Sequence, residues 1–178
     1  MISELVLIEK LSKLVPKKKG DVVVGIGDDA GVVKVDKDRL LLATCDALVE
    51  NVHFLLKEWK PHELGEKLVS VNTSDIAAMG GIPRHFLVSL VLPQKLSSHF
   101  VNTFYRGVAA ACKRYDIDVI GGNLSAGSTF VLAGFIIGDV NPKQLITRKG
   151  AKVGDAVFVT GEFGKATKVP VARVAEGH

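Results

Sequence analysis

Cysteine and aromatic residues are both scarce in this sequence, and each scarcity excludes a class of protein. The two cysteines, Cys45 and Cys112, form no CxxC spacing, so the sequence indicates neither a zinc site nor a disulfide framework. Aromatic residues make up 6% of the chain, and the lysines are scattered apart from Lys17–Lys19. A nucleic-acid interface of basic and stacking side chains is therefore not indicated, in spite of the net charge of +4.

Long apolar runs and an N-terminal targeting pattern are missing too. The longest apolar runs, residues 86–92 and 130–138, are shorter than the roughly 20 residues that a membrane-spanning helix needs. Met1–Glu4 has no basic region followed by an apolar core, so no signal peptide is indicated. We therefore expect a soluble, cytoplasmic protein with no membrane partner, which agrees with the missing disulfide pattern.

Glycine and apolar residues, by contrast, are plentiful. The 18 glycines outnumber the six prolines, which indicates many tight turns. A content of 47% hydrophobic and 24% charged residues is typical of a globular protein. A length of 178 residues allows one domain or slightly more.

The spacing of the apolar residues predicts alternating helices and strands. Helical periodicity predicts helices at 5–14, 63–79 and 97–114. Shorter apolar segments between turn residues predict strands at 21–26, 31–35, 40–44, 85–92, 117–120, 130–140 and 156–160. This order indicates an α+β domain in which helices pack on one face of a mixed β-sheet. The composition changes after Val140, and we interpret 165–178 as a poorly ordered tail or the start of a segment cut short.

Acidic residues recur where predicted strands end. Asp28 and Asp29 follow the strand 21–26 on a turn with glycines at 25 and 27. Neighbouring aspartates repel each other, so a fold that holds them together usually neutralises them with a cation. An ordinary acidic β-turn is the alternative, and it is slightly favoured for this motif alone. Asp46 ends a leucine-rich strand, where a capping aspartate is the favoured alternative to a metal ligand.

Two further polar positions strengthen the metal hypothesis. Asp75 lies in a helix of small and apolar residues, where a carboxylate is costly to bury unless it is paired or metal-bound. Gly121, Gly122 and Asn123 follow a strand and predict a turn with N–H groups free for phosphate and an amide oxygen for a metal, or else a plain hairpin turn. The P-loop and GxGxxG patterns are both missing. Carboxylates on separate segments indicate a hard cation, and Mg²⁺ with a nucleotide is the natural candidate.

Four motifs of this chain resemble the thiamine-monophosphate kinase family, which belongs to the aminoimidazole-ribonucleotide-synthetase-like superfamily. They are Gly-Ile-Gly-Asp-Asp-Ala-Gly-Val-Val at 25–33, Asp46–Phe54, Val71–Gly80 and Gly121-Gly122-Asn123. Their shared order and spacing make the resemblance specific. It covers the N-terminal, ATP-binding half of the family and the first strand of its second domain, through Gly161.

The resemblance implies ATP-dependent phosphorylation of thiamine monophosphate to thiamine diphosphate, with Mg²⁺ and ATP as cofactors. The metal site that it implies is made by Asp29, Thr44, Cys45, Asp46, Asp75 and Asn123. The ATP contacts that it implies come from Tyr105, Gly122, Asn123 and Arg148. His53 would contact the thiamine phosphate, and Asp28 would be a water-mediated partner. The residue types alone favour a packed core histidine at 53 and a helix-face aromatic at 105, and no catalytic residue is assigned.

The same resemblance implies a domain organisation and a homodimer. Residues 1–139 would form the N-terminal ATP- and Mg-binding domain, and 140–178 the start of a truncated C-terminal domain. The apolar strands 21–26 and 39–45 would pair the sheets of two copies, as family members do when they close a β-barrel across their interface.

Two alternatives stay open. One is a sister ATP-dependent enzyme of the superfamily, for hydrogenase maturation or selenophosphate synthesis, although the reactive cysteine or lysine usual there is not visible. The other is a non-catalytic nucleotide-binding or dimerisation module. The sequence departs from the family at Asn123-Leu124-Ser125, where most relatives carry Asp-Thr-Thr, and it lacks the family's later motifs. We therefore expect weak Mg-ATP binding and slow turnover of thiamine monophosphate.

Overall fold

The computed structural model describes residues 3–15 and 20–159 of the chain. Within them, the chain forms three helices and one six-stranded sheet. The helices are α1 (Glu4–Leu14), α2 (Pro61–Ala78) and α3 (Ser98–Tyr115). The strands are β1 (Val22–Val24), β2 (Gly31–Lys34), β3 (Leu40–Val49), β4 (Ile82–Leu92), β5 (Asp118–Ala126) and β6 (Val131–Val140).

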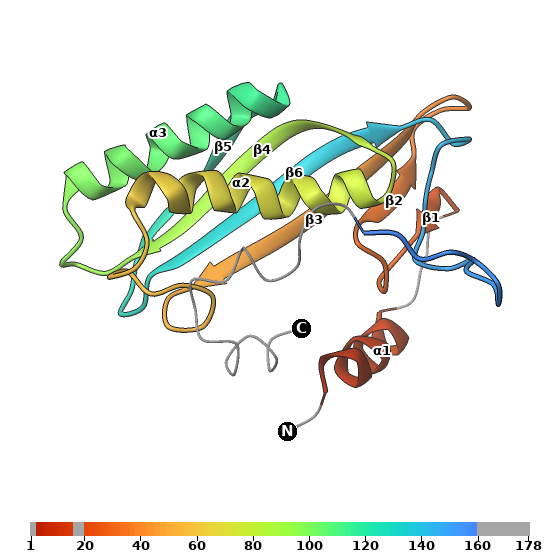
Figure 1. Cartoon of the computed structure of the whole chain (residues 1–178), viewed down its shortest axis with the longest axis horizontal. Helices are drawn as coiled ribbons and strands as arrows, with labels where there is room; N and C mark the ends of the chain where they lie inside the picture. Colours follow the sequence, from red (N-terminus) through yellow and green to blue (C-terminus); the bar gives the residue numbers. More distant parts are fainter. Residues whose placement is uncertain (1–2, 16–19, 160–178) are drawn as a thin grey trace.

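The sheet is mixed, with the strand order β1-β2-β3-β6-β4-β5. The strands β4 and β5 run parallel, since α3 connects them, and the other neighbouring pairs are antiparallel. Helices α2 and α3 lie side by side across one face of the sheet, whereas α1 lies apart from them (Figure 1). The predicted α+β fold, with helices packed on one face of a mixed sheet, is confirmed.

The core lies between this helical layer and the sheet. Side chains alternate along a strand, so every second residue of β4 points toward the helices, and Phe86, Val88 and Leu90 are fully buried there. Leu64 and Leu68 of α2 are also fully buried. Burying one such side chain stabilises the fold by about 1.5–3 kcal/mol, so this layer holds α2 firmly on the sheet.

The helices α2 and α3 approach each other closely because glycines lie where they meet. A Cβ atom at Gly107 of α3 would lie 1.9 Å from the backbone oxygen of His62, at the start of α2. A Cβ atom at Gly65 of α2 would lie 2.2 Å from the backbone oxygen of Phe104. Any larger residue at either position would force the two helices apart.

The face of the sheet opposite α2 and α3 is apolar and partly open. The strand residues that alternate with the buried ones point to this face. In the strand register, Phe135 of β6 lies between Cys45 of β3 and Leu87 of β4. Phe135 is 42% exposed, which is unusual for a large aromatic side chain at the centre of a sheet.

No helix in the described part of the chain combines the length and the apolar character needed to cross a membrane.

Several predicted strands need correction: β1 covers only Val22–Val24 of the predicted 21–26, and β4 begins at Ile82. β3 continues past residue 44 to Val49, because β6 pairs with it along its whole length. β5 continues past residue 120 to Ala126, so the expected turn at Gly121 and Gly122 is extended strand paired with β4. Residues 156–159 form no strand, and the last residue of that prediction is outside the described residues.

The basic run Lys17–Lys19, which follows the first predicted helix, and the predicted tail at 165–178 lie outside the described residues. The helix itself, α1, ends at Leu14 as expected, and Ser3 caps it by accepting a hydrogen bond from the N–H of Val6.

Candidate metal and nucleotide site

The acid turn, residues 25–30 between β1 and β2, forms the first part of the site. Gly27 has a φ of 116°, a conformation that side-chain-bearing residues rarely adopt. Asp28 Oδ1 accepts a hydrogen bond from the N–H of Asp29 at 3.0 Å. Ala30, at the end of the turn, is only 2% exposed and so fixes it against the core. The turn therefore presents two adjacent carboxylates from a constrained backbone.

Strand β3 and helix α2 supply the second part. β2 pairs with β3 only over Leu40–Ala43, and beyond this segment the N–H of Asp46 donates to Oδ1 of Asn72, a buried residue of α2, at 3.0 Å. Thr44 Oγ1 donates to Asp75 Oδ2 at 3.1 Å. These two hydrogen bonds join α2 to the part of β3 that continues beyond β2. Thr44, Asp46 and Asp75 therefore lie on the helix-covered face of the sheet.

The carboxylates of the two parts act on each other electrostatically. The pKa of Asp75 is raised, first by burial and next by the neighbouring charge of Asp46. The hydrogen bond from Thr44 opposes this rise, Asp29 adds to it, and Arg148 lowers it slightly. The ionised form of Asp75 is thus disfavoured where it lies, and a cation bound among these carboxylates would relieve that cost.

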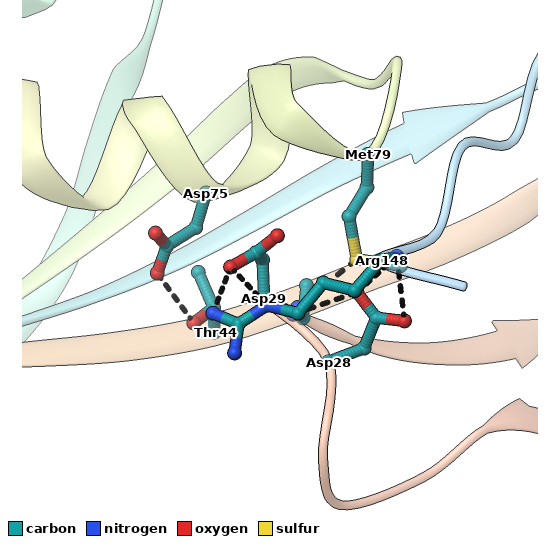
Figure 2. Close-up of polar contacts among 7 residues, drawn as sticks. Asp28, Asp29, Thr44, Asp75, Met79 and Arg148 are labelled. Carbon is teal, nitrogen blue, oxygen red and sulfur yellow. Dashed lines mark hydrogen bonds and ion pairs between the residues drawn. The ribbon is translucent and has the colours of Figure 1, made fainter. Parts of the chain in front are cut away.

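One cation is already present, as the side chain of Arg148, which follows β6 in the chain. Its Nε donates to Asp29 Oδ1 at 3.0 Å, and its Nη2 forms an ion pair with the same oxygen (Figure 2). Its backbone N–H faces both carboxylate oxygens of Asp28, at 3.3 and 3.4 Å. The guanidinium therefore offsets the charge of Asp29, one of the two carboxylates of the acid turn.

The donor set fits a hard divalent cation, but it is not assembled around one. Asp29, Asp46, Asp75 and Thr44 offer only oxygen atoms, the ligands that Mg²⁺ prefers. Among the described residues, however, no three acidic, histidine or cysteine side chains are grouped closely enough to hold a metal ion. Arg148 pairs with one of the four. A metal would thus require Asp29 to turn from Arg148 toward Asp46 and Asp75.

An open hollow in front of the acid turn leaves room for a ligand. It has a volume of about 920 Å³, and its lining includes Asp28, Asp29, Thr44 and Arg148 together with Ile8 of α1. Small-molecule sites typically have volumes of about 300–1,000 Å³, so a nucleotide would fit.

Residues 27–140 match the family model "AIR synthase related protein, N-terminal domain". This match covers more than half of the chain. The chain belongs to the AIR synthase related family. The resemblance found in the sequence is thereby confirmed, and the chain corresponds to the family's N-terminal domain.

The chain is similar to several thiamine-monophosphate kinases. The enzyme of that name from Aquifex aeolicus is 39% identical over 163 residues, which is 92% of this chain and 50% of the relative. The one from Bacillus subtilis is 41% identical over 144 residues, which is 80% of this chain and 44% of the relative. The chain therefore spans about half the length of these relatives.

A solved structure of AaThiL complexed with AMPPCP and TMP has the same fold. It superposes with a TM-score of 0.77 at 38% identity, over 86% of this chain and 46% of that one. The N-terminal half of the family is thus a unit whose sheet and helices this chain reproduces.

Two residues assigned to the nucleotide site by the family resemblance lie away from the acids. Gly122 and Asn123 are on β5, the edge strand, three strands from β3 and hence roughly 14 Å from it. Asn123 lies beside Ser89 of β4 and donates to Ser125 Oγ at 2.9 Å. Gly122 is required locally, because a Cβ atom there would lie 1.9 Å from the oxygen of Val88.

The other assigned residues are Cys45, His53 and Tyr105, and of these Cys45 lines the same hollow as Asp28 and Asp29. Cys45 is exposed, and the alternation of β3 directs its side chain to the face opposite Thr44 and Asp46. His53 follows β3, and its Nδ1 accepts the N–H of Val49 at 3.0 Å. Tyr105 of α3 is half-buried with its ring edge-on to Phe104, and burial raises its pKa. Their family roles stay predictions.

Sequence reasoning missed two residues that hold the site together. Asn72 accepts the N–H of Asp46 in β3, and the sulfur of Met79 accepts the N–H of Ala30 at 3.0 Å. Both lie on the Asp75 face of α2, three residues before and four residues after it. That spacing was visible in the sequence and could have shown that the three side chains share one face.

Proposed function

We propose that this chain is the nucleotide- and metal-binding half of a thiamine-monophosphate kinase. The observation that carries the proposal is the set of interacting carboxylates, Asp29, Asp46 and Asp75, with Arg148 as their counter-charge. The kinases named above support the substrate, as does the solved relative with a nucleotide analogue and TMP. Residues 1–139 would be the ATP- and Mg-binding domain, and 140–178 the start of a second domain.

The reaction would form a bond between the γ-phosphorus of ATP and a phosphate oxygen of thiamine monophosphate. The bond from that phosphorus to the bridging oxygen would break, and ADP would leave with the electron pair. Bound Mg²⁺ would supply positive charge to the phosphate oxygens. Asp29, Asp46 and Asp75 would hold it, Thr44 would orient Asp75 through its hydrogen bond, and Arg148 would turn from Asp29 to the phosphates.

The remaining assignments rest on the family resemblance. Tyr105, Gly122 and Asn123 would contact ATP, His53 would contact the substrate phosphate, and Cys45 and Asn123 would complete the metal shells. Because Asn123 is on an edge strand, its contribution would require β5 to move or a ligand to bridge the distance.

A homodimer formed through the sheet is part of the same proposal, as is location in the cytoplasm. The open sheet face with Phe135 at its centre supports the dimer, because large exposed apolar patches are usually covered by a partner. Sedimentation velocity at micromolar concentration tests this, and a clean monomer would contradict it.

The proposed function is tested by binding and turnover on the 178-residue protein. We expect Mg-AMPPCP to bind weakly and thiamine diphosphate to form far more slowly than the order of 1 s⁻¹ usual for an enzyme, since half of the relatives' length is not included. Calorimetry and chromatographic detection of thiamine diphosphate measure the two. No nucleotide binding at millimolar concentration would contradict the proposal. Binding without any turnover would favour the second candidate, a non-catalytic nucleotide-binding module, which the half-length match supports.

Replacing Arg148 with glutamine should tighten metal binding and weaken nucleotide binding. The guanidinium competes with a cation for Asp29, and a partly exposed ion pair is worth about 1 kcal/mol, so the affinity for Mn²⁺ alone should rise about fivefold. Electron paramagnetic resonance of free Mn²⁺ measures it. Lys149→Gln changes the net charge equally without touching Asp29, and equal Mn²⁺ affinities in the two variants would show that Arg148 does not compete.

A further inference from the structure

Met79, the residue that ends α2, connects both charged segments of the site to that helix. Its side chain is fully buried, and its sulfur accepts the N–H of Ala30 at 3.0 Å (Figure 2). Its backbone oxygen accepts the N–H of Ile146 at 3.2 Å, two residues before Arg148. A single residue thus fixes the acid turn through its side chain and the segment of Arg148 through its main chain.

The hydrogen bond to sulfur restricts the backbone of the acid turn next to Asp29. The N–H of Ala30 belongs to the peptide group that begins at the carbonyl carbon of Asp29, so holding it restricts rotation about the Cα–C bond of Asp29. A thioether is a weak acceptor, yet a buried N–H with no acceptor is costly. Since Ala30 is 2% exposed, water cannot readily replace the sulfur.

The position of Met79 on the helix adds a second constraint. Asp75 lies one turn earlier on the same face of α2. The sulfur therefore sets the distance between the acid turn and the helix that carries Asp75. Ordinary core filling by a flexible side chain would make no such demand on the sulfur atom, because any apolar group of the same size would serve.

We propose that Met79 is a positioning residue for the acid turn: its thioether sulfur, as a hydrogen-bond acceptor, holds Asp29 in register with Arg148 and Asp75. The consequence for cation affinity rests on the proposed function. The geometric part does not, because the contact between Asp29 and Arg148 exists without any ligand.

The sequence permits a single-atom test. Met1 and Met79 are the two methionines of the chain, so biosynthetic replacement of methionine by norleucine exchanges sulfur for CH₂ at one internal position. Selenomethionine is the matched control, because it keeps a chalcogen acceptor. Met79→Leu protein prepared with methionine or with norleucine differs only at position 1, and the two preparations should behave alike.

Three measurements separate the steps of the argument. In the norleucine protein, we expect the amide hydrogen of Ala30 to exchange about tenfold faster. We expect the Nε–H resonance of Arg148, which reports its contact with Asp29, to shift or broaden. We also expect the affinity for Mn²⁺ to fall about tenfold, the lower end of the loss seen when a contact that supports a metal ligand is removed. Selenomethionine should leave all three as they are in the methionine protein.

The outcomes distinguish the inference from the proposed function. An unchanged exchange rate at Ala30 would overturn the hydrogen bond, and an unchanged Arg148 resonance would overturn the positioning role. If the methionine protein itself binds no Mn²⁺, the proposed function fails, while the first two measurements still decide the role of Met79. If Mn²⁺ binds equally to both proteins in spite of a shifted resonance, the link from position to affinity is wrong.

Discussion

The Asp75→Asn protein is expected to lose metal–nucleotide binding and to become more stable. Even residues that merely support a metal ligand change affinity by about 10- to 100-fold, so removing a ligating charge should weaken Mg-AMPPCP binding by more than about 100-fold. Asparagine keeps an oxygen for the hydrogen bond from Thr44. It removes a charge that burial and the neighbouring Asp46 disfavour, and hence relieves repulsion in the folded state.

The stability gain should depend on pH with a definite sign. The folded-state pKa of Asp75 is raised, so the ionised side chain destabilises the folded protein above that pKa and ceases to do so as the pH falls through it. The difference between the variant and the parent protein should therefore be present at neutral pH and disappear in acid. Urea unfolding at several pH values measures it, with Asp38→Asn, on an exposed turn, as the control. A less stable Asp75→Asn protein at neutral pH would contradict the argument.

Replacing Gly107 with alanine is expected to damage the whole domain. The new methyl group would lie 1.9 Å from the backbone oxygen of His62, and backbone cannot rotate aside as a flexible side chain can. The helices must separate, which should lower the free energy of unfolding by about 3 kcal/mol, the upper end for overpacked cores. Because α2 carries Asp75, metal binding should weaken with it.

Gly20→Ala is the matched control for this variant. No atom lies within 4 Å of a Cβ built at Gly20, so the same chemical change should leave the urea midpoint nearly unaltered. Equal midpoints for the two variants would mean that α2 and α3 can move apart without cost.

Local patterns were sufficient to find the helices and the acidic residues, because these depend on periodicity and on strand ends. The course of β5 was not predictable from such patterns. Gly121 and Gly122 suit a turn as well as an extended edge strand, and pairing with β4, which is distant in the sequence, decides between them. The sequence likewise gave no sign that Arg148 would pair with Asp29, since the two are brought together only by the complete sheet.

The family resemblance assigned Cys45 to the metal shell, and that role stays a prediction. The predicted strand ended at residue 44, so the alternation of side chains was not applied to Thr44, Cys45 and Asp46. Once β3 is seen to continue to Val49, alternation places Cys45 on the opposite face from its two neighbours. A strand boundary that is wrong by a few residues thus hides which neighbouring side chains share a face of the sheet.

The central place of β6 determines when the domain can form during synthesis. β6 pairs with β3 on one side and with β4 on the other, although it follows both of them in the sequence and is the last strand in the described part of the chain. Until Val140 has been made, β3 and β4 each have one edge without a paired strand. The core residues Phe86, Val88 and Leu90 of β4 then lack the neighbouring strand β6. The nascent chain should therefore stay unfolded while most of the domain is being made and then fold late, in one step. Until then, chaperones should protect the unpaired edges of β3 and β4.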